Sequence, residues 1–426
     1  MLQGLDQRDK ERYPLKYAIN HTTPEPLINR ISDPVAQLKT HAWPRFRDQL
    51  NKSVLFIYTG GRSARLQGLQ KSESPREFFY GYPFFKEKGL KVDFVETDNV
   101  SRHRISMRYW RLRRNSKILT KHFGIGCRAH MLLGLIDKIN QYDLVIGTTD
   151  SIGLGLCYLK RCGVIKANII FLNMGLGSGI AMRDHDKTVA HRRIEKEVIA
   201  LLGYCKNLVS LGKPEHQYLL TLAPQLKAKL VFLPFGIDTQ FWHPLVGGRV
   251  GAAKTVLSVG NDLNRDWDMA LKVASICPEV HFKFLTRRLE RRQCPPNVEL
   301  IVGDIKGMSV SDVAVRTLYQ ESDLVIIPLR QTLQPSGQSV ALQSLACGTA
   351  VLISKTKGLW DSSRFIDGET IDLVDLGSPE SFKAKIELSL SCSARSLEIA
   401  KKGRALVSQE YSVEIFSEHL QEICSH

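Results

Sequence analysis

A polar turn lies between two apolar segments in the last third of the sequence. The stretch QPSGQSV, residues 334–340, follows the strand-like run LVIIPL and precedes a segment of helical character that begins near Gln338. Pro335 and Gly337 favour the turn. Four side chains bring amide or hydroxyl groups to it: Gln334, Ser336, Gln338 and Ser339. Beside the free N–H groups of a helix start, these groups suit a phosphate or a sugar hydroxyl, whereas a plain helix cap with Ser336 as N-cap is the structural alternative.

Two series of alternating strand and helix patterns surround this turn. The first contains the apolar runs in 53–58, 90–96, 142–147, 167–173 and 206–210, and the second those in 255–259, 280–286, 298–302, 323–328 and 349–354. Such alternation predicts an α/β fold with two parallel sheets that carry helices on both faces. Residues 229–254, rich in proline and glycine, are expected to link the domains.

Length and composition fit this organisation. A chain of 426 residues with 43% hydrophobic and 24% charged residues is expected to form about two globular domains. No apolar run approaches the ~20 residues that span a bilayer, and the first thirty residues do not resemble a signal peptide. The nine cysteines are odd in number and contain no C-x-x-C pair, so neither a disulfide framework nor a zinc site is indicated. We therefore expect a cytoplasmic protein without a bound metal.

The net charge of +16 is concentrated in one segment. No acidic residue occurs between Asp98 and Asp137, and a helical wheel there places apolar residues on one face and basic residues opposite or beside them. The basic residues that we expect to form a membrane or acceptor face are Arg108, Arg111, Arg114, Lys117 and Lys121. Such a helix can lie on anionic lipid, or it can be an ordinary helix with solvated charges. Nucleic acid is a poorer partner, because the aromatic residues follow the apolar stripe.

The run LQSLACGTAVLIS, residues 342–354, resembles the signature LEAMACGTPVV of the donor-binding domain in GT-B glycosyltransferases of the group 1, or family 4, type. The segment PFGIDTQFWHP, residues 234–244, is similar to the interdomain link of that family. The resemblance implies two Rossmann-like domains facing across a cleft, with a C-terminal helix that crosses back. The implied ranges are an extension at 1–50, an acceptor-side domain at 51–240, a donor-binding domain at 250–403 and the returning helix at 404–426.

The resemblance also implies a reaction. Such enzymes transfer a sugar from a nucleotide-diphosphate sugar to a glycan or lipid-linked acceptor, mostly with retention of configuration and without a metal. The chain departs from the family pattern at two places. The usual Glu-x7-Glu pair falls on Pro335 and Gln343, so that a neutral amide would meet the ribose. The usual phosphate-binding Arg and Lys fall on Asn261 and Arg265, which leaves Arg265 as the cation expected to hold the diphosphate.

Three further predictions concern the first domain. Gly60 and Gly61, with Arg62, resemble a glycine-rich loop at which a backbone without Cβ approaches the donor, although a simple tight turn is the alternative. Asp150 and His185 are candidates for a catalytic base, although a structural role is the favoured reading of each. No P-loop or complete G-x-G-x-x-G occurs, which argues against a kinase, an ATPase or a dehydrogenase.

Two other functions remain open. A non-catalytic relative that binds a glycan or a partner would explain the missing carboxylates. A nucleotide-sugar epimerase would need a catalytic carboxylate pair that the sequence does not reveal. The basic segment also makes a peripheral position on the inner face of a membrane an expectation.

Overall fold

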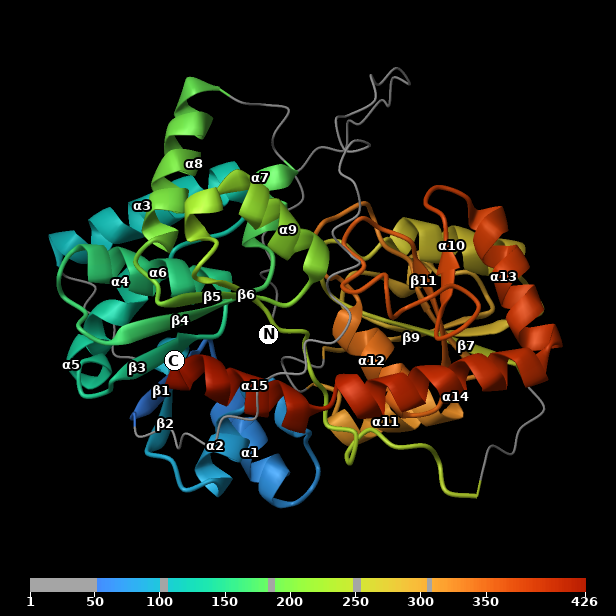
Figure 1. Ribbon diagram of the computed structural model, residues 1–426. Helices are drawn as coiled ribbons and strands as arrows, with labels where there is room; N and C mark the ends of the chain where they lie inside the picture. The colour runs from blue at the N-terminus through green and yellow to red at the C-terminus, as the bar shows by residue number, and fades with distance from the viewer. Residues whose placement is uncertain (1–51, 100–105, 183–187, 248–253, 305–308) are drawn as a thin grey trace, which may run out of the picture. The chain divides into compact units, whose positions relative to one another are not determined.

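A computed structural model describes residues 52–99, 106–182, 188–247, 254–304 and 309–426. It contains two six-stranded sheets in which all paired strands run parallel, as predicted (Figure 1). The first sheet has the order β2-β1-β3-β4-β5-β6 and the second the order β12-β11-β10-β7-β8-β9. The chain is therefore an α/β protein with two Rossmann-like domains.

The first sheet consists of β1 (Val54–Tyr58), β2 (Val92–Glu96), β3 (Leu144–Gly147), β4 (Asn168–Asn173), β5 (Asn207–Ser210) and β6 (Leu230–Phe232). Its helices are α1 (Arg62–Gln70), α2 (Tyr82–Glu87), α3 (Met107–Phe123), α4 (Ala129–Leu132), α5 (Ile136–Ile139), α6 (Asp150–Arg161), α7 (Leu176–Ala181), α8 (Val189–Leu202) and α9 (Lys213–Leu222). A short 3-10 helix, η4 (Arg76–Phe79), lies between α1 and α2.

The second sheet consists of β7 (Thr255–Val259), β8 (His281–Leu285), β9 (Val298–Ile301), β10 (Leu324–Ile327), β11 (Ala350–Ser354) and β12 (Asp372–Val374). Its helices are α10 (Trp267–Ile276), α11 (Asp312–Glu321), α12 (Gln338–Ala346), α13 (Pro379–Ser391) and α14 (Ser393–Glu410), and α15 (Val413–Ser425) follows.

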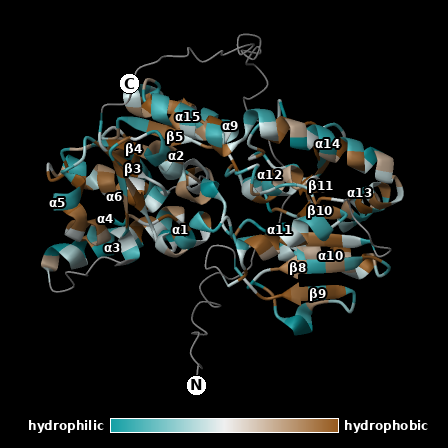
Figure 2. Ribbon diagram, turned by 90° about the horizontal axis from the view of Figure 1, so that it is seen from below, coloured by the Kyte–Doolittle hydropathy of each residue, from teal (hydrophilic) through white to brown (hydrophobic). Residues whose placement is uncertain are grey.

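Both faces of each sheet are buried, which explains the continuous apolar runs in the sequence. In β1, Phe56 belongs to the cluster on one face of the sheet and Leu55 to the cluster on the other, because successive side chains of a strand point to opposite sides. The cluster that contains Phe56 extends through Trp242 of the interdomain link into the second domain, where it includes Leu257 of β7. Hydrophobic residues are concentrated on the strands, while the helices carry hydrophilic residues as well (Figure 2).

The C-terminal helix returns to the first domain. The helical conformation is interrupted at Tyr411 and Ser412, between α14 and α15. The Ser412 side chain accepts a hydrogen bond from the backbone N–H of Ile415 and caps α15. Gly81 packs so closely on α15 that a Cβ there would lie 3.3 Å from the Ser417 Oγ. The expected start of this helix at residue 404 falls within α14, which packs on the second domain; the returning part is α15.

Candidate functional site

Arg265 lies in the turn after β7, next to the carboxyl end of the second sheet. Arg265 is 3% exposed, and its one ion pair with a described residue joins Nη2 to Asp262 Oδ2 at 3.5 Å. Nε and Nη1 are buried and have no hydrogen-bond partner among the residues that the structure describes. A buried guanidinium N–H without a partner is costly, so this position favours an incoming anion.

Two glycines make room for this guanidinium. A Cβ at Gly260 would lie 2.3 Å from Arg265 Nε, and a Cβ at Gly337 would lie 3.3 Å from Nη1. Gly337 is the N-cap residue of α12 and has φ 78°, a conformation that favours glycine. Arg265 therefore lies at the N-terminus of α12, where the free N–H groups and the helix dipole also attract an anion.

The polar turn at 334–336 is ordered by Asn264, a residue that the sequence analysis missed. Asn264 Nδ2 donates to Gln334 Oε1 at 3.1 Å and to Ser336 Oγ at 2.7 Å. Ser336 does not cap the helix, because Gly337 occupies the N-cap position and α12 has no side-chain cap. Asn264 carries no charge and belongs to no motif, so only the folded turn reveals its role.

The turn at 332–338 contacts the first domain directly. Gln338 Nε2 donates to the carbonyl oxygen of Leu211 at 3.3 Å, and Ser178 Oγ lies 3.1 Å from Thr332 Oγ1. A Cβ at Gly175 would lie 2.9 Å from Gln334 Cδ. The carboxyl ends of β4, β5 and β10 therefore meet at this turn. Ser339, in the first turn of α12, is half-buried.

Gln343, the expected ribose partner, has its amide engaged elsewhere. Nε2 donates to Glu77 Oε1 at 3.0 Å, and Oε1 accepts from the hydroxyl of Tyr319 at 3.3 Å. Gln343 is 2% exposed. Its contact with a ribose stays a prediction, and such a contact would require the amide to leave Glu77.

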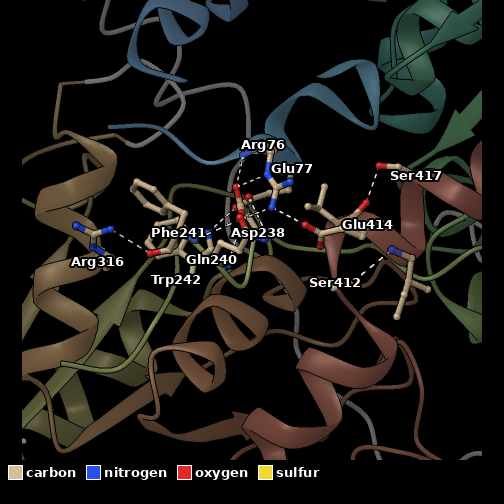
Figure 3. A network of polar contacts seen from close by, with 12 residues as sticks. Arg76, Glu77, Asp238, Gln240, Phe241, Trp242, Arg316, Ser412, Glu414 and Ser417 are labelled. Atoms are coloured by element: carbon tan, nitrogen blue, oxygen red, sulfur yellow. Dashed lines mark hydrogen bonds and ion pairs between the residues drawn. The ribbon is translucent and has the colours of Figure 1, made fainter. Parts of the chain in front are cut away.

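Glu77 belongs to a polar network that joins η4, the interdomain link and α15 (Figure 3). It also accepts hydrogen bonds from Trp242 Nε1 at 2.7 Å and from the backbone N–H of Asp238 at 3.1 Å. Arg76 lies between two carboxylates, 2.7 Å from Asp238 and 2.5 Å from Glu414. Burial, with the nearby charge of Asp238, raises the pKa of Glu77 to about 7.

The glycine turn after β1 carries its own carboxylate. Gly61, with φ 80°, is the N-cap residue of α1. Glu96 Oε1 accepts from the backbone N–H groups of Arg62 and, at 3.3 Å, of Ser63. A Cβ at Gly60 would lie 2.8 Å from Asp98 Oδ2. The N-terminus of α1 is thus capped internally, and the donor role of Gly60, Gly61 and Arg62 stays a prediction.

Asp150 begins α6 and is buried. Its Oδ1 accepts from the backbone N–H of Met174 at 3.0 Å, and burial raises its pKa to about 7. Glu215, fully buried on α9, accepts from the backbone N–H of Ser178 at 3.1 Å. Burial and then the neighbouring Asp150 raise the pKa of Glu215 to about 8. Both carboxyls hold the segment after β4, and the sequence analysis did not single out Glu215. His185 lies outside the described residues.

The basic residues of α3 are exposed. Arg108, Arg111, Arg114, Lys117 and Lys121 all face solvent. The opposite face is buried through Tyr109, Leu112 and Phe123, and Ser106 caps the helix. Beside the charges, Met107 is 88% and Trp110 54% exposed. In the part of the chain that the structure describes, no helix is long and apolar enough to cross a membrane, and no group of three or more His, Cys, Asp or Glu side chains is arranged to hold a metal.

Solved structures share this architecture over most of the chain. Sucrose-phosphate synthase from Thermosynechococcus elongatus superposes with a TM-score of 0.63 at 15% identity, covering 87% of this chain and 98% of the other. The chain has the GT-B fold. HepE from Anabaena, in complex with UDP-glucose, gives 0.60 at 12% identity, with 88% and 99% covered. WaaG, a glycosyltransferase involved in lipopolysaccharide biosynthesis, gives 0.58 at 14% identity, with 87% and 99% covered.

No family model and no curated protein matches the sequence. At identities of 12–15% the structural similarity establishes the fold, and the GT-B resemblance expected from residues 342–354 is confirmed at that level.

Proposed function

We propose that this GT-B protein is a glycosyltransferase that takes a sugar from a nucleoside diphosphate sugar. The observation that carries the proposal is Arg265, a buried guanidinium with two unpartnered N–H groups at the N-terminus of α12. A diphosphate would satisfy both the guanidinium and the free N–H groups of the helix.

This arrangement suits the chemistry of glycosyl transfer. As the bond to the sugar breaks, negative charge grows on the departing diphosphate, and preorganised donors stabilise that charge. Arg265 and the N-terminus of α12 supply such donors without a metal ion. We propose that configuration is retained and that the leaving phosphate accepts the acceptor's proton, because Asp150 already accepts a backbone N–H and is buried.

The acceptor is proposed to be a glycan or a lipid-linked sugar. The exposed basic face of α3, with Trp110 beside it, supports an approach to an anionic surface on the side of the first domain. We propose a peripheral position on the inner face of a membrane for this reason.

The experiment that tests the donor site is a thermal-shift and calorimetric screen against UDP, GDP and ADP and their sugars. UDP-glucose is the first choice, since HepE was solved with it. We expect one nucleoside diphosphate to raise the melting temperature of the wild type and to bind Arg265→Ala about 10-fold to 100-fold more weakly.

Arg330→Ala is the matched control for this screen. Arg330 belongs to the same domain, is half-exposed and pairs with Asp268 at 3.1 Å. Its loss should leave nucleotide binding unchanged. If a well-folded wild type bound no nucleotide at millimolar concentration, the transferase proposal would be wrong.

A non-catalytic binder is the second candidate, and one observation favours it. Gln343, which falls on a carboxylate position of the resembling family, is engaged with Glu77 and Tyr319. Binding of a nucleotide sugar without either hydrolysis or transfer would favour the binder, whereas release of free nucleoside diphosphate over time would favour the transferase.

A further inference from the structure

We propose that Arg288 is a second cation for the donor diphosphate and that Asn261 positions it. The proposal rests on the proposed function and names a residue that the sequence pattern does not indicate. Position 261, where the resembling family carries a phosphate-binding arginine, is neutral here, which leaves the site one positive charge short.

The Asn261 side chain is fully engaged in organising the edge of the second sheet. Nδ2 donates to the carbonyl oxygen of Gly303 at 3.0 Å. Oδ1 accepts from Thr286 Oγ1 at 3.1 Å and from the backbone N–H of Arg287 at 2.7 Å. Asn261 thus joins the segments that follow β7, β8 and β9. Its side-chain amide is used in these contacts and is not available to a ligand.

These ties bring Arg288 to the same turn. Arg288 Nε donates to the carbonyl oxygen of Asn261 at 2.7 Å. The side chain is exposed, and no carboxylate within the described ranges pairs with it. Its neighbours differ, because Arg287 lies 3.3 Å from Asp304 and Arg292 lies 2.6 Å from Glu290. The positive charge of Arg288 and the N–H groups other than that of Nε are therefore available to another partner.

Two guanidinium groups consequently lie against consecutive residues at the end of β7. Arg265 packs on Gly260, and Arg288 is bonded to Asn261. Arg288 pairs with no carboxylate of the described residues, and Arg265 pairs with Asp262 through Nη2 alone, at 3.5 Å. Two positive charges that flank one turn at the carboxyl end of a parallel sheet suit a ligand with more than one negative charge. A nucleoside diphosphate is such a ligand, and a nucleoside is not.

The test compares affinities for a nucleoside, its monophosphate and its diphosphate, with the base chosen as the tightest binder among UDP, GDP and ADP. Arg288→Ala is expected to weaken the diphosphate about tenfold, to weaken the monophosphate less and to leave the nucleoside unchanged. Arg292→Ala removes an equal charge four residues away and should leave all three affinities unchanged. Equal weakening of all three ligands by Arg288→Ala, or no weakening, would overturn the proposal.

Asn261 is tested as a positioning residue through the double variant. If Asn261 acts by placing Arg288, Asn261→Ala and Asn261→Ala/Arg288→Ala should lose the same diphosphate affinity, whereas a separate structural role would make the losses add. The inference and the proposed function fail differently. Loss of binding in Arg265→Ala but not in Arg288→Ala removes only the inference, and a wild type that binds no nucleotide removes both.

Discussion

Gln343 of α12 donates a side-chain N–H to the Glu77 carboxylate of η4 at 3.0 Å, and this buried hydrogen bond joins the second domain to the first. The pairing gives a physical reason for an amide at a position where the resembling family has a carboxylate. Two carboxylates at this distance would repel each other in a buried site, whereas an amide supplies the N–H that Glu77 accepts.

The first prediction concerns this pair. Gln343→Glu should destabilise the protein by about 3 kcal/mol at pH 8, because it leaves like charges buried together. The pKa of Glu77 is already raised to about 7, so its proton is bound more tightly in the folded state, and lowering the pH below 6 should restore much of the loss. Urea unfolding of the wild type and of Gln343→Glu at pH 6 and pH 8 measures the destabilisation at each pH.

A matched control exchanges the carboxylate and the amide between positions 77 and 343. Glu77→Gln combined with Gln343→Glu again places one amide beside one carboxylate, and we expect it to be more stable at pH 8 than Gln343→Glu alone. An equal loss at both pH values, with no recovery in the double variant, would show that the contact contributes nothing specific.

The second prediction concerns the buried carboxyls Asp150 and Glu215. Burial raises their pKa values to about 7 and about 8, so the folded state holds these protons more tightly than the unfolded chain. Stability should therefore fall as the pH rises from about 5 through 8. Asp150→Asn keeps an oxygen that accepts the Met174 N–H and should reduce the loss of stability with rising pH. Glu215→Gln should remove the part of that loss that comes from Glu215. Calorimetric melting across this pH range checks the slopes, and parallel curves for wild type and variants would contradict the prediction.

The third prediction concerns Arg65 of α1 and Asp312 of α11, whose side chains are fully buried and 2.7 Å apart. Removing one partner leaves the other charge buried, so Arg65→Ala should cost about 3–5 kcal/mol in the free energy of unfolding. Replacing both, as Arg65→Met with Asp312→Leu, should recover most of that loss. Guanidinium unfolding of the two variants provides the comparison, and a double variant as unstable as the single one would argue that packing rather than charge decides.

The fourth prediction concerns the exposed basic face of α3. Replacing Arg111, Arg114 and Lys117 by glutamate should abolish sedimentation with vesicles that contain anionic lipid, since each basic residue near such a surface contributes roughly 1 kcal/mol. The corresponding change at Lys401 and Lys402, exposed on α14, is the control. Absence of wild-type binding to anionic vesicles, or equal loss in both variants, would leave α3 as a solvated helix.

The sequence by itself determined the fold. Apolar runs such as Val54–Tyr58 and Leu324–Ile327 are buried on both faces, so short hydrophobic runs that alternate with helical patterns indicate strands of parallel sheets. The helix starts at Ser412 and Asp266 also have a local cause, because in each a polar N-cap side chain accepts a backbone N–H of the first helical turn. Strands and helix starts depend on residues that are close in the sequence, so the sequence pattern is enough to predict them.

The partners of the site side chains were decided only by the tertiary structure. Gln343 and Glu77 are 266 positions apart, as Arg65 and Asp312 are 247 apart, and no local pattern announces such pairs. Glu215 and Asn264 went unnoticed because an acid or an amide in a polar segment is usually solvated. Their importance arises from burial, which raises the cost of every polar group without a partner and so selects which residues must meet.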